Sequence, residues 1–182
     1  MNGERSDAMD EKERLSALEV ALNNEMKERE FYLKNADRTN NPLGKAMFER
    51  IAEDEVEHYE RLKQLHVKWK EKDKWPETVP LVVNQTNIRD LLVNTLKNID
   101  KSAQTDAGDL EAIKTAAGFE EKGVKFYKDL AASSTDMREK DFFTLLSMIE
   151  YEHFMSLRDA EEYFENPAAW FYQAEHSMVD GG

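Results

Sequence analysis

The chain has 182 residues, a formal net charge of −13 and a pI of about 4.8. Nucleic acid and anionic membrane surfaces are poor partners for so acidic a chain, because they carry negative charge themselves. The sequence contains no cysteine, which excludes disulfides, thiol catalysis, zinc fingers and cysteine-bound iron–sulfur centres. The polar start and the lack of a long apolar run predict no signal peptide and no membrane span. We therefore expect a cytoplasmic protein.

Apolar residues recur at three- and four-residue steps along four stretches of the chain, which predicts four long amphipathic helices. The stretch "RTNNPLG" separates the first helix from the second, and Thr105 or Asp106 is expected to cap the third. The expected helices cover about residues 10–38, 45–72, 105–132 and 138–165.

A long connection separates the two pairs of helices. Trp75-Pro76 and Pro80 end helical structure after the second helix, and residues 88–100 are expected to form a short helix within the connection. Two antiparallel pairs joined by one long crossover describe a ferritin-like four-helix bundle. The predicted organisation is a flexible N-terminus at residues 1–9, a bundle at 10–165 with its crossover at about 73–104, and an irregular tail at 166–182.

The two predicted hairpins carry the same sequence pattern. Shifted by 95 residues without a gap, residues 25–62 and 120–157 are identical at 11 of 38 positions. Unrelated segments of ordinary composition would match at about two or three positions. We interpret the chain as a duplicated antiparallel helix hairpin, which gives an all-α bundle with pseudo-twofold symmetry.

The repeat carries a pattern typical of metal ligands. The second and fourth helices each contain Glu-x-x-His, a spacing that brings both side chains to one side of a helix. The first and third helices each place a Glu on their apolar stripe, 30 residues before the Glu of the motif. One Glu from each of two helices and Glu-x-x-His from each of the others is the ligand set of di-iron and di-manganese carboxylate bundles. The candidate ligands are Glu25, Glu55, His58, Glu120, Glu150 and His153.

Charge balance supports a site for two metal ions. Four carboxylates carry −4, which two divalent ions neutralise, and carboxylate with imidazole suits iron or manganese. Without metal, two carboxylates 4 Å apart in a site of effective dielectric 20 repel by about 4 kcal/mol. A single Glu-x-x-His is usually part of a solvated helix face, but two with matched spacing indicate a metal site. We therefore expect bound metal to raise the melting temperature.

Further residues stand close to the candidate ligands. Tyr32 and Tyr127 lie two turns from Glu25 and Glu120 on the same faces. They are interpreted either as core aromatics or as residues that hydrogen-bond a ligand carboxylate or take part in redox chemistry. Glu28 follows Glu25 by three residues and is expected to be solvated or to lie beside the ligands. Its repeat partner is Gly123, which has no side chain to offer.

The paired motifs resemble the diiron domain of the rubrerythrin family. "EMKEREFY" with "EDEVEH", and "EEKGVKFY" with "IEYEH", are similar to its two halves, and the resemblance covers about residues 10–172. It implies a centre of two iron ions that reduces hydrogen peroxide or oxygen in the cytoplasm and protects the cell from oxidative stress. The iron ligands implied are Glu25, Glu55, His58, Glu120, Glu150 and His153.

The chain departs from that family in two ways. Rubrerythrins proper carry a rubredoxin module with Cys-x-x-Cys pairs, whereas this sequence has no cysteine. The resemblance therefore implies an external electron-donor protein such as a rubredoxin. Many rubrerythrins also carry a Glu where this chain has Gly123. The symmetric ligand set leaves peroxidase, oxidase and ferroxidase activity open.

Two other functions compete with the diiron enzyme. One is an iron-binding, ferroxidase or storage-related protein such as a ferritin-like cargo, although the duplicated motif argues against the asymmetric site of a ferritin cage. The other is a bundle whose metal, such as zinc, only stabilises it. Manganese or zinc can also substitute for the two iron ions of the diiron centre. We expect a homodimer, and neither nucleic acid nor membrane as a partner.

Overall fold

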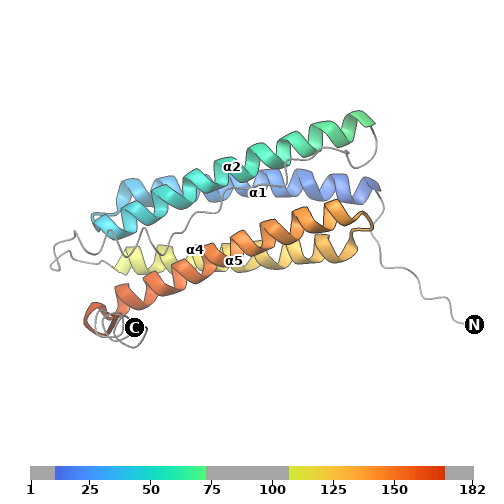
Figure 1. Cartoon of the computed structure of the whole chain (residues 1–182). Coiled ribbons are helices and arrows are strands. Elements are labelled where there is room, and N and C mark those ends of the chain that lie inside the picture. Colours follow the sequence, from blue (N-terminus) through green and yellow to red (C-terminus); the bar gives the residue numbers. More distant parts are fainter. Residues whose placement is uncertain (1–10, 73–106, 171–182) are drawn as a thin grey trace, which may run out of the picture.

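The computed structural model describes residues 11–72 and 107–170, and nearly all of them are helical. The described part of the chain contains no strand, which confirms the predicted all-α fold. Figure 1 shows two helical hairpins that lie one above the other. The four long helices are α1 (Glu11–Arg38), α2 (Pro42–Lys72), α4 (Ala107–Ser133) and α5 (Met137–Glu165).

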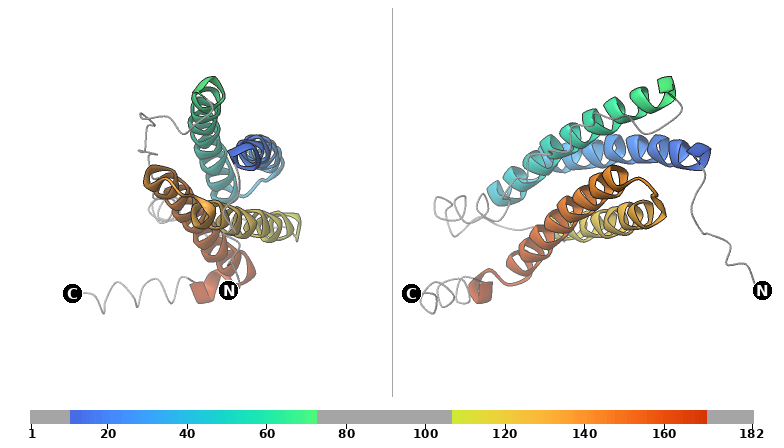
Figure 2. Two further views of the ribbon diagram at one scale, coloured as in Figure 1. Left: turned by 90° about the vertical axis from the view of Figure 1, so that its right-hand side faces the viewer. Right: turned by 45° about the vertical axis from the view of Figure 1, so that its right-hand side comes forward.

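The two helices of each hairpin pack against each other. The most extensive contacts join α1 to α2 and α4 to α5, and between the hairpins α1 meets α4 and α2 meets α5. The two further views in Figure 2 show the same pairing from other directions. This arrangement is a four-helix bundle of two antiparallel pairs, as the duplicated sequence predicts.

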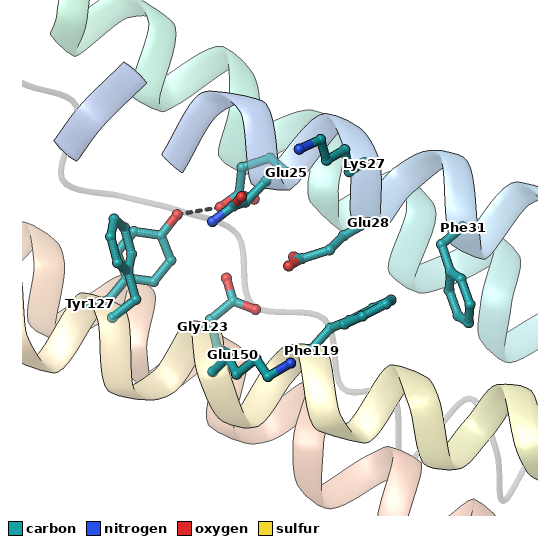
Figure 3. A pocket seen from close by; sticks show the side chains of 11 residues that line it. Glu25, Lys27, Glu28, Phe31, Phe119, Gly123, Tyr127 and Glu150 are labelled. Carbon is teal, nitrogen blue, oxygen red and sulfur yellow. Dashed lines mark hydrogen bonds between the residues drawn. The ribbon is translucent and has the colours of Figure 1, made fainter. Parts of the chain in front are cut away.

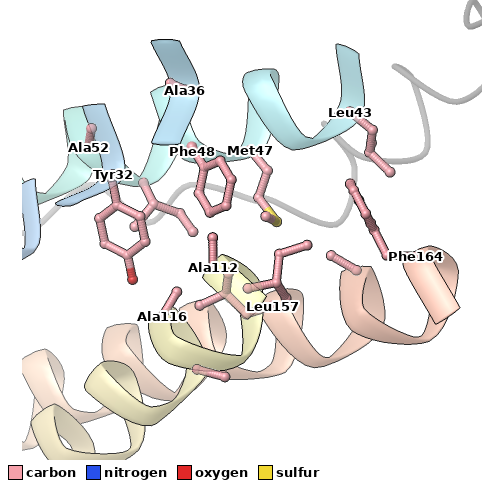
Figure 4. Packing of buried hydrophobic residues seen from close by; sticks show 14 of the residues in the cluster. Tyr32, Ala36, Leu43, Met47, Phe48, Ala52, Ala112, Ala116, Leu157 and Phe164 are labelled. Carbon is pink, nitrogen blue, oxygen red and sulfur yellow. The ribbon is translucent and has the colours of Figure 1, made fainter. Parts of the chain in front are cut away.

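The apolar interior is divided into two clusters at opposite ends of the bundle, and all four helices contribute to each. Cluster 1 forms where α1 and α5 end and where α2 and α4 begin (Figure 4). Cluster 2 forms at the other end. The repeat exchanges the clusters, because Tyr32 and Phe48 lie in cluster 1 while Tyr127 and Phe143 lie in cluster 2. The other large residues are Leu43, Met47, Ile51, Ile113, Leu157, Tyr163 and Phe164 in cluster 1, and Leu18, Leu62, Leu65, Trp69, Leu130, Phe142, Leu146 and Ile149 in cluster 2.

The start of α2 differs from the prediction. The helix begins at Pro42, not near Lys45, because proline at the first helical position loses no intrahelical hydrogen bond. Asn41 caps this end: its Oδ1 accepts hydrogen bonds from the backbone N–H of Leu43, at 2.9 Å, and of Gly44, at 3.1 Å. The prediction that "RTNNPLG" is not helical is therefore wrong for residues 42–44, which belong to α2.

The tail also differs where the structure describes it. Residues 167–170 are helical after a break at Asn166, so the predicted irregular structure is wrong for these four residues. Trp170 packs edge-on against Tyr163 of α5, with 5.9 Å between ring centroids. The predictions for residues 1–9, for the crossover with its short helix at 88–100, for the caps at 105 and 106 and for residues 171–182 lie outside the described residues. No helix in the described part is both long and apolar enough to cross a membrane.

Candidate metal centre

Six polar side chains meet in the middle of the bundle, between cluster 1 and cluster 2. Each exposes 2% or less of its surface. They form two overlapping groups of four, and within each group one potential ligand atom per residue lies within 4.8 Å of the others. Glu55 and Glu150 belong to both groups, so their carboxylates would be shared if each group held an ion. The first group is Glu25, Glu55, His58 and Glu150, and the second is Glu55, Glu120, Glu150 and His153.

His58 faces the centre with its Nδ1 atom. This atom lies 3.2 Å from Oε2 of Glu25 and 3.2 Å from Oε2 of Glu55. Oε1 of Glu150, from the opposite hairpin, is 3.4 Å away. One imidazole nitrogen therefore shares a small space with three carboxylates.

His153 has the matching orientation. Its Nδ1 lies 3.5 Å from Oε1 of Glu55, 3.6 Å from Oε2 of Glu120 and 3.7 Å from Oε2 of Glu150. The imidazole rings of His58 and His153 stack with 5.6 Å between centroids and 21° between planes. The structure thus brings together all six residues that the sequence motif selects.

The two tyrosines connect the halves of the repeat crosswise. The hydroxyl of Tyr32 in α1 donates a hydrogen bond to Oε1 of Glu120 in α4, and the hydroxyl of Tyr127 in α4 donates to Oε1 of Glu25 in α1. Burial, followed by the charge of the bonded glutamate, raises the pKa of each tyrosine well above its ordinary value. Both hydroxyls therefore remain protonated and act as donors.

The metal-free centre favours protonation. Burial, and then the charge of Glu55, raises the pKa of Glu25 well above its ordinary value, and burial with Glu150 does the same for Glu120. Burial lowers the pKa of His58, but the surrounding carboxylates, Glu55 first, outweigh it and raise that pKa well above its ordinary value. The centre therefore takes up protons when no other cation compensates its charge.

Several buried atoms of the centre have no hydrogen-bond partner among the described residues. They include Oε1 of Glu55, Oε2 of Glu120, both carboxylate oxygens of Glu150 and Nδ1 of His153. An unpaired buried acceptor is unfavourable, and a bound cation relieves it. Four carboxylates and two imidazoles are a donor set that iron and manganese accept. The residues therefore fit a pair of divalent ions.

The comparison with protein families agrees with this geometry. The model of the Rubrerythrin family matches residues 16–161, most of the chain and all six residues of the centre. The chain belongs to the rubrerythrin family. This membership confirms the resemblance in the sequence motifs, and with the buried cluster it supports a diiron-carboxylate protein. Searches of curated proteins and of solved structures gave no significant match.

This rubrerythrin-family chain has a cavity of about 530 Å³ between α1 and α4 that reaches the centre (Figure 3). Glu25, Tyr127 and Glu150 form its inner end. The exposed side chains of Lys27 and Lys122 also line it, so the cavity extends to solvent. Its apolar walls are Phe31, Phe119 and Phe126.

Glu28 and Gly123 make this cavity asymmetric. Glu28 is half-buried and points across the cavity toward Glu150 (Figure 3). Burial, and then the charges of Glu55 and Glu150, raises its pKa to about 8. Opposite it, a Cβ atom on Gly123 would lie 3.3 Å from Cγ of Glu150, so glycine leaves room beside that carboxylate.

The sequence motif did not reveal Asp54, which lies behind His153. Its Oδ2 is 3.4 Å from Nε2 of His153, and its Oδ1 accepts a hydrogen bond of 2.7 Å from Arg50. Asp54 is 4% exposed. In the sequence, Asp54 follows Arg50 by four residues and directly precedes the candidate ligand Glu55. This spacing does not determine whether the side chain of Asp54 points to solvent or to the core.

We predict that ferrous iron added anaerobically raises the melting temperature. An ion that binds only the folded chain adds about 2.7 kcal/mol when its free concentration is 100 times Kd. Glu120→Gln should lose most of this gain, whereas Glu121→Gln, on the exposed neighbour, should keep it. Differential scanning calorimetry with and without a chelator measures the effect. Equal melting temperatures of the iron-loaded and chelated wild type would contradict a buried metal centre.

A second prediction concerns the stability of the metal-free protein against pH. Because the folded pKa of Glu28 is about 8 and its ordinary value is 4.5, its ionisation opposes folding progressively as pH rises from about 4.5 to 8. Glu28→Gln should therefore equal the wild type near pH 4.5 and be more stable at pH 8. Urea denaturation across this range measures the difference, with Glu30→Gln on the exposed face as control. A difference that stays constant with pH would show that Glu28 does not titrate in this way.

Proposed function

We propose that this protein is a diiron oxidoreductase that reduces hydrogen peroxide to water. The observation that carries the proposal is the buried pair of overlapping ligand groups, which share Glu55 and Glu150, in a chain of the rubrerythrin family. Two ferrous ions held there would supply the two electrons that the reaction needs. The balance is one peroxide, two electrons and two protons to two waters.

Each half of the centre would hold one iron. Glu25 and His58 would be the terminal ligands of one ion, and Glu120 and His153 those of the other, with the two shared carboxylates between them. The crosswise tyrosine hydrogen bonds hold Glu25 and Glu120 in position. Manganese or zinc would fit the same donors but would change the chemistry.

The cavity between α1 and α4 gives a small oxidant a path to the centre. Its volume of about 530 Å³ exceeds what peroxide needs, and the space beside Gly123 adjoins Glu150. Glu28 faces that space and is protonated at neutral pH in the metal-free protein. We assign Glu28 the role of a proton donor to the leaving oxygen of peroxide.

The electrons must come from outside the bundle after each turnover. The chain has no cysteine and therefore no rubredoxin-type iron site of its own. We propose that a separate reductase or electron-donor protein, such as a rubredoxin, restores the ferrous state.

The deciding experiment compares two oxidants. The protein is loaded anaerobically with two ferrous ions per chain and mixed in a stopped-flow instrument with stoichiometric hydrogen peroxide or with dissolved oxygen, while near-ultraviolet absorbance reports ferric iron. We expect fast oxidation by peroxide and slow oxidation by oxygen. Fast reaction with oxygen alone would favour an oxidase or ferroxidase. If the bound iron reacted with neither oxidant, the metal would serve only to stabilise the bundle.

The same instrument tests Glu28. Loss of a general acid costs about 10²- to 10⁴-fold, so Glu28→Gln should slow the peroxide reaction by at least about 10². Iron stoichiometry should remain two per chain, because Glu28 is not among the six ligands. Glu30→Gln is the matched control on the exposed face of α1. If Glu28→Gln oxidised at the wild-type rate with peroxide, solvent and not Glu28 would donate the proton to the leaving oxygen.

A further inference from the structure

The two histidines of the centre have different surroundings, although the repeat makes the ligands themselves equivalent. Both direct Nδ1 toward the carboxylates, so each Nε2 points away from the centre. Nε2 of His153 lies 3.4 Å from Oδ2 of Asp54. Nε2 of His58 is buried and has no hydrogen-bond partner among the described residues.

The repeat explains why only one histidine has this neighbour. The offset of 95 residues pairs Asp54 with Ile149 and Arg50 with Leu145. Arg50 donates to Oδ1 of Asp54 and thereby orients the carboxylate, whereas Ile149 is an apolar member of cluster 2 and accepts no hydrogen bond. The second hairpin therefore lacks both parts of the arrangement that the first hairpin supplies.

This difference acts on metal binding through the imidazole tautomer. A histidine that binds metal through Nδ1 carries its proton on Nε2, and that proton needs an acceptor when it is buried. For His153, Oδ2 of Asp54 lies 3.4 Å from Nε2, an ion-pair contact that a small shift of either side chain would turn into a hydrogen bond accepted from that proton. For His58 the same tautomer buries a donor with no acceptor in the described part of the chain. Loss of such a carboxylate–histidine contact typically weakens metal binding by about 10- to 100-fold.

We propose that the two metal positions are inequivalent, and that Asp54, held by Arg50, makes the position of His153 and Glu120 the tighter one. Asp54 is a positioning residue that acts through His153. The position of His58 and Glu25 fills second and releases its ion first. This inference rests on the proposed metal centre but not on peroxide reduction.

Anaerobic titration with cobalt(II), followed by visible absorbance and calorimetry, tests the proposal. In the wild type we expect two ions per chain in two steps. Since the charge of the first ion also weakens binding of the second, single-position variants give the decisive comparison. His58→Ala leaves the position of His153, and His153→Ala leaves the position of His58. We expect the first variant to bind its one ion about 10- to 100-fold more tightly than the second.

Two further variants separate positioning from general stability. Asp54→Asn should weaken cobalt binding in the His58→Ala background and leave it unchanged in the His153→Ala background. The reciprocal change, Leu145→Arg with Ile149→Asp, should strengthen binding in the His153→Ala background. Equal affinities of the two single-position variants, or equal weakening by Asp54→Asn in both backgrounds, would overturn the inference. Absence of both bound cobalt and bound ferrous iron in the wild type would overturn the metal centre itself.

Discussion

The structure depends on four carboxylates and two imidazoles buried between two apolar clusters. Such a group is unfavourable in a helical core unless a cation or protons balance its charge. Burial raises the pKa of Glu25 and of Glu120 well above the ordinary value, so these two carboxyl groups hold protons in the metal-free chain. Two divalent ions would balance the charge fully and would satisfy oxygens that have no hydrogen-bond partner among the described residues. The stability of the fold and the proposed metal binding therefore depend on the same six side chains.

The duplicated hairpins supply equivalent residues to this site, and local differences between the hairpins make its surroundings asymmetric. Each hairpin supplies the same ligands, and each tyrosine hydroxyl crosses to a glutamate of the other hairpin. Where the two halves differ, the difference lies next to the ligands. Glu28 faces the cavity opposite Gly123, and Asp54 lies behind His153 where the repeat has Ile149. An otherwise symmetric set of side chains therefore has a cavity beside Glu150 and a carboxylate behind one of its two histidines.

Most of the helices and all six candidate ligands could be predicted from the sequence, because helical period and Glu-x-x-His spacing are local signals. The sequence prediction begins α2 near Lys45, later than its observed start at Pro42, because "RTNNPLG" is rich in turn residues, whereas proline is favourable at the first helical position. The orientations of the Asp54 and Glu28 side chains could not be predicted from the sequence. An acidic residue on a charged helix points to solvent or to the core according to how the helices pack. Residues 167–170 form one helical turn, which has no period long enough to detect.

Anomalous diffraction at the iron absorption edge, from crystals loaded anaerobically with ferrous iron, locates bound iron within the bundle. We predict two iron peaks in each chain, between the two apolar clusters. The shared carboxylates of Glu55 and Glu150 should lie between the peaks, with His58 at one ion and His153 at the other. A bundle with no internal peak, or with iron bound only by surface carboxylates, would contradict this prediction.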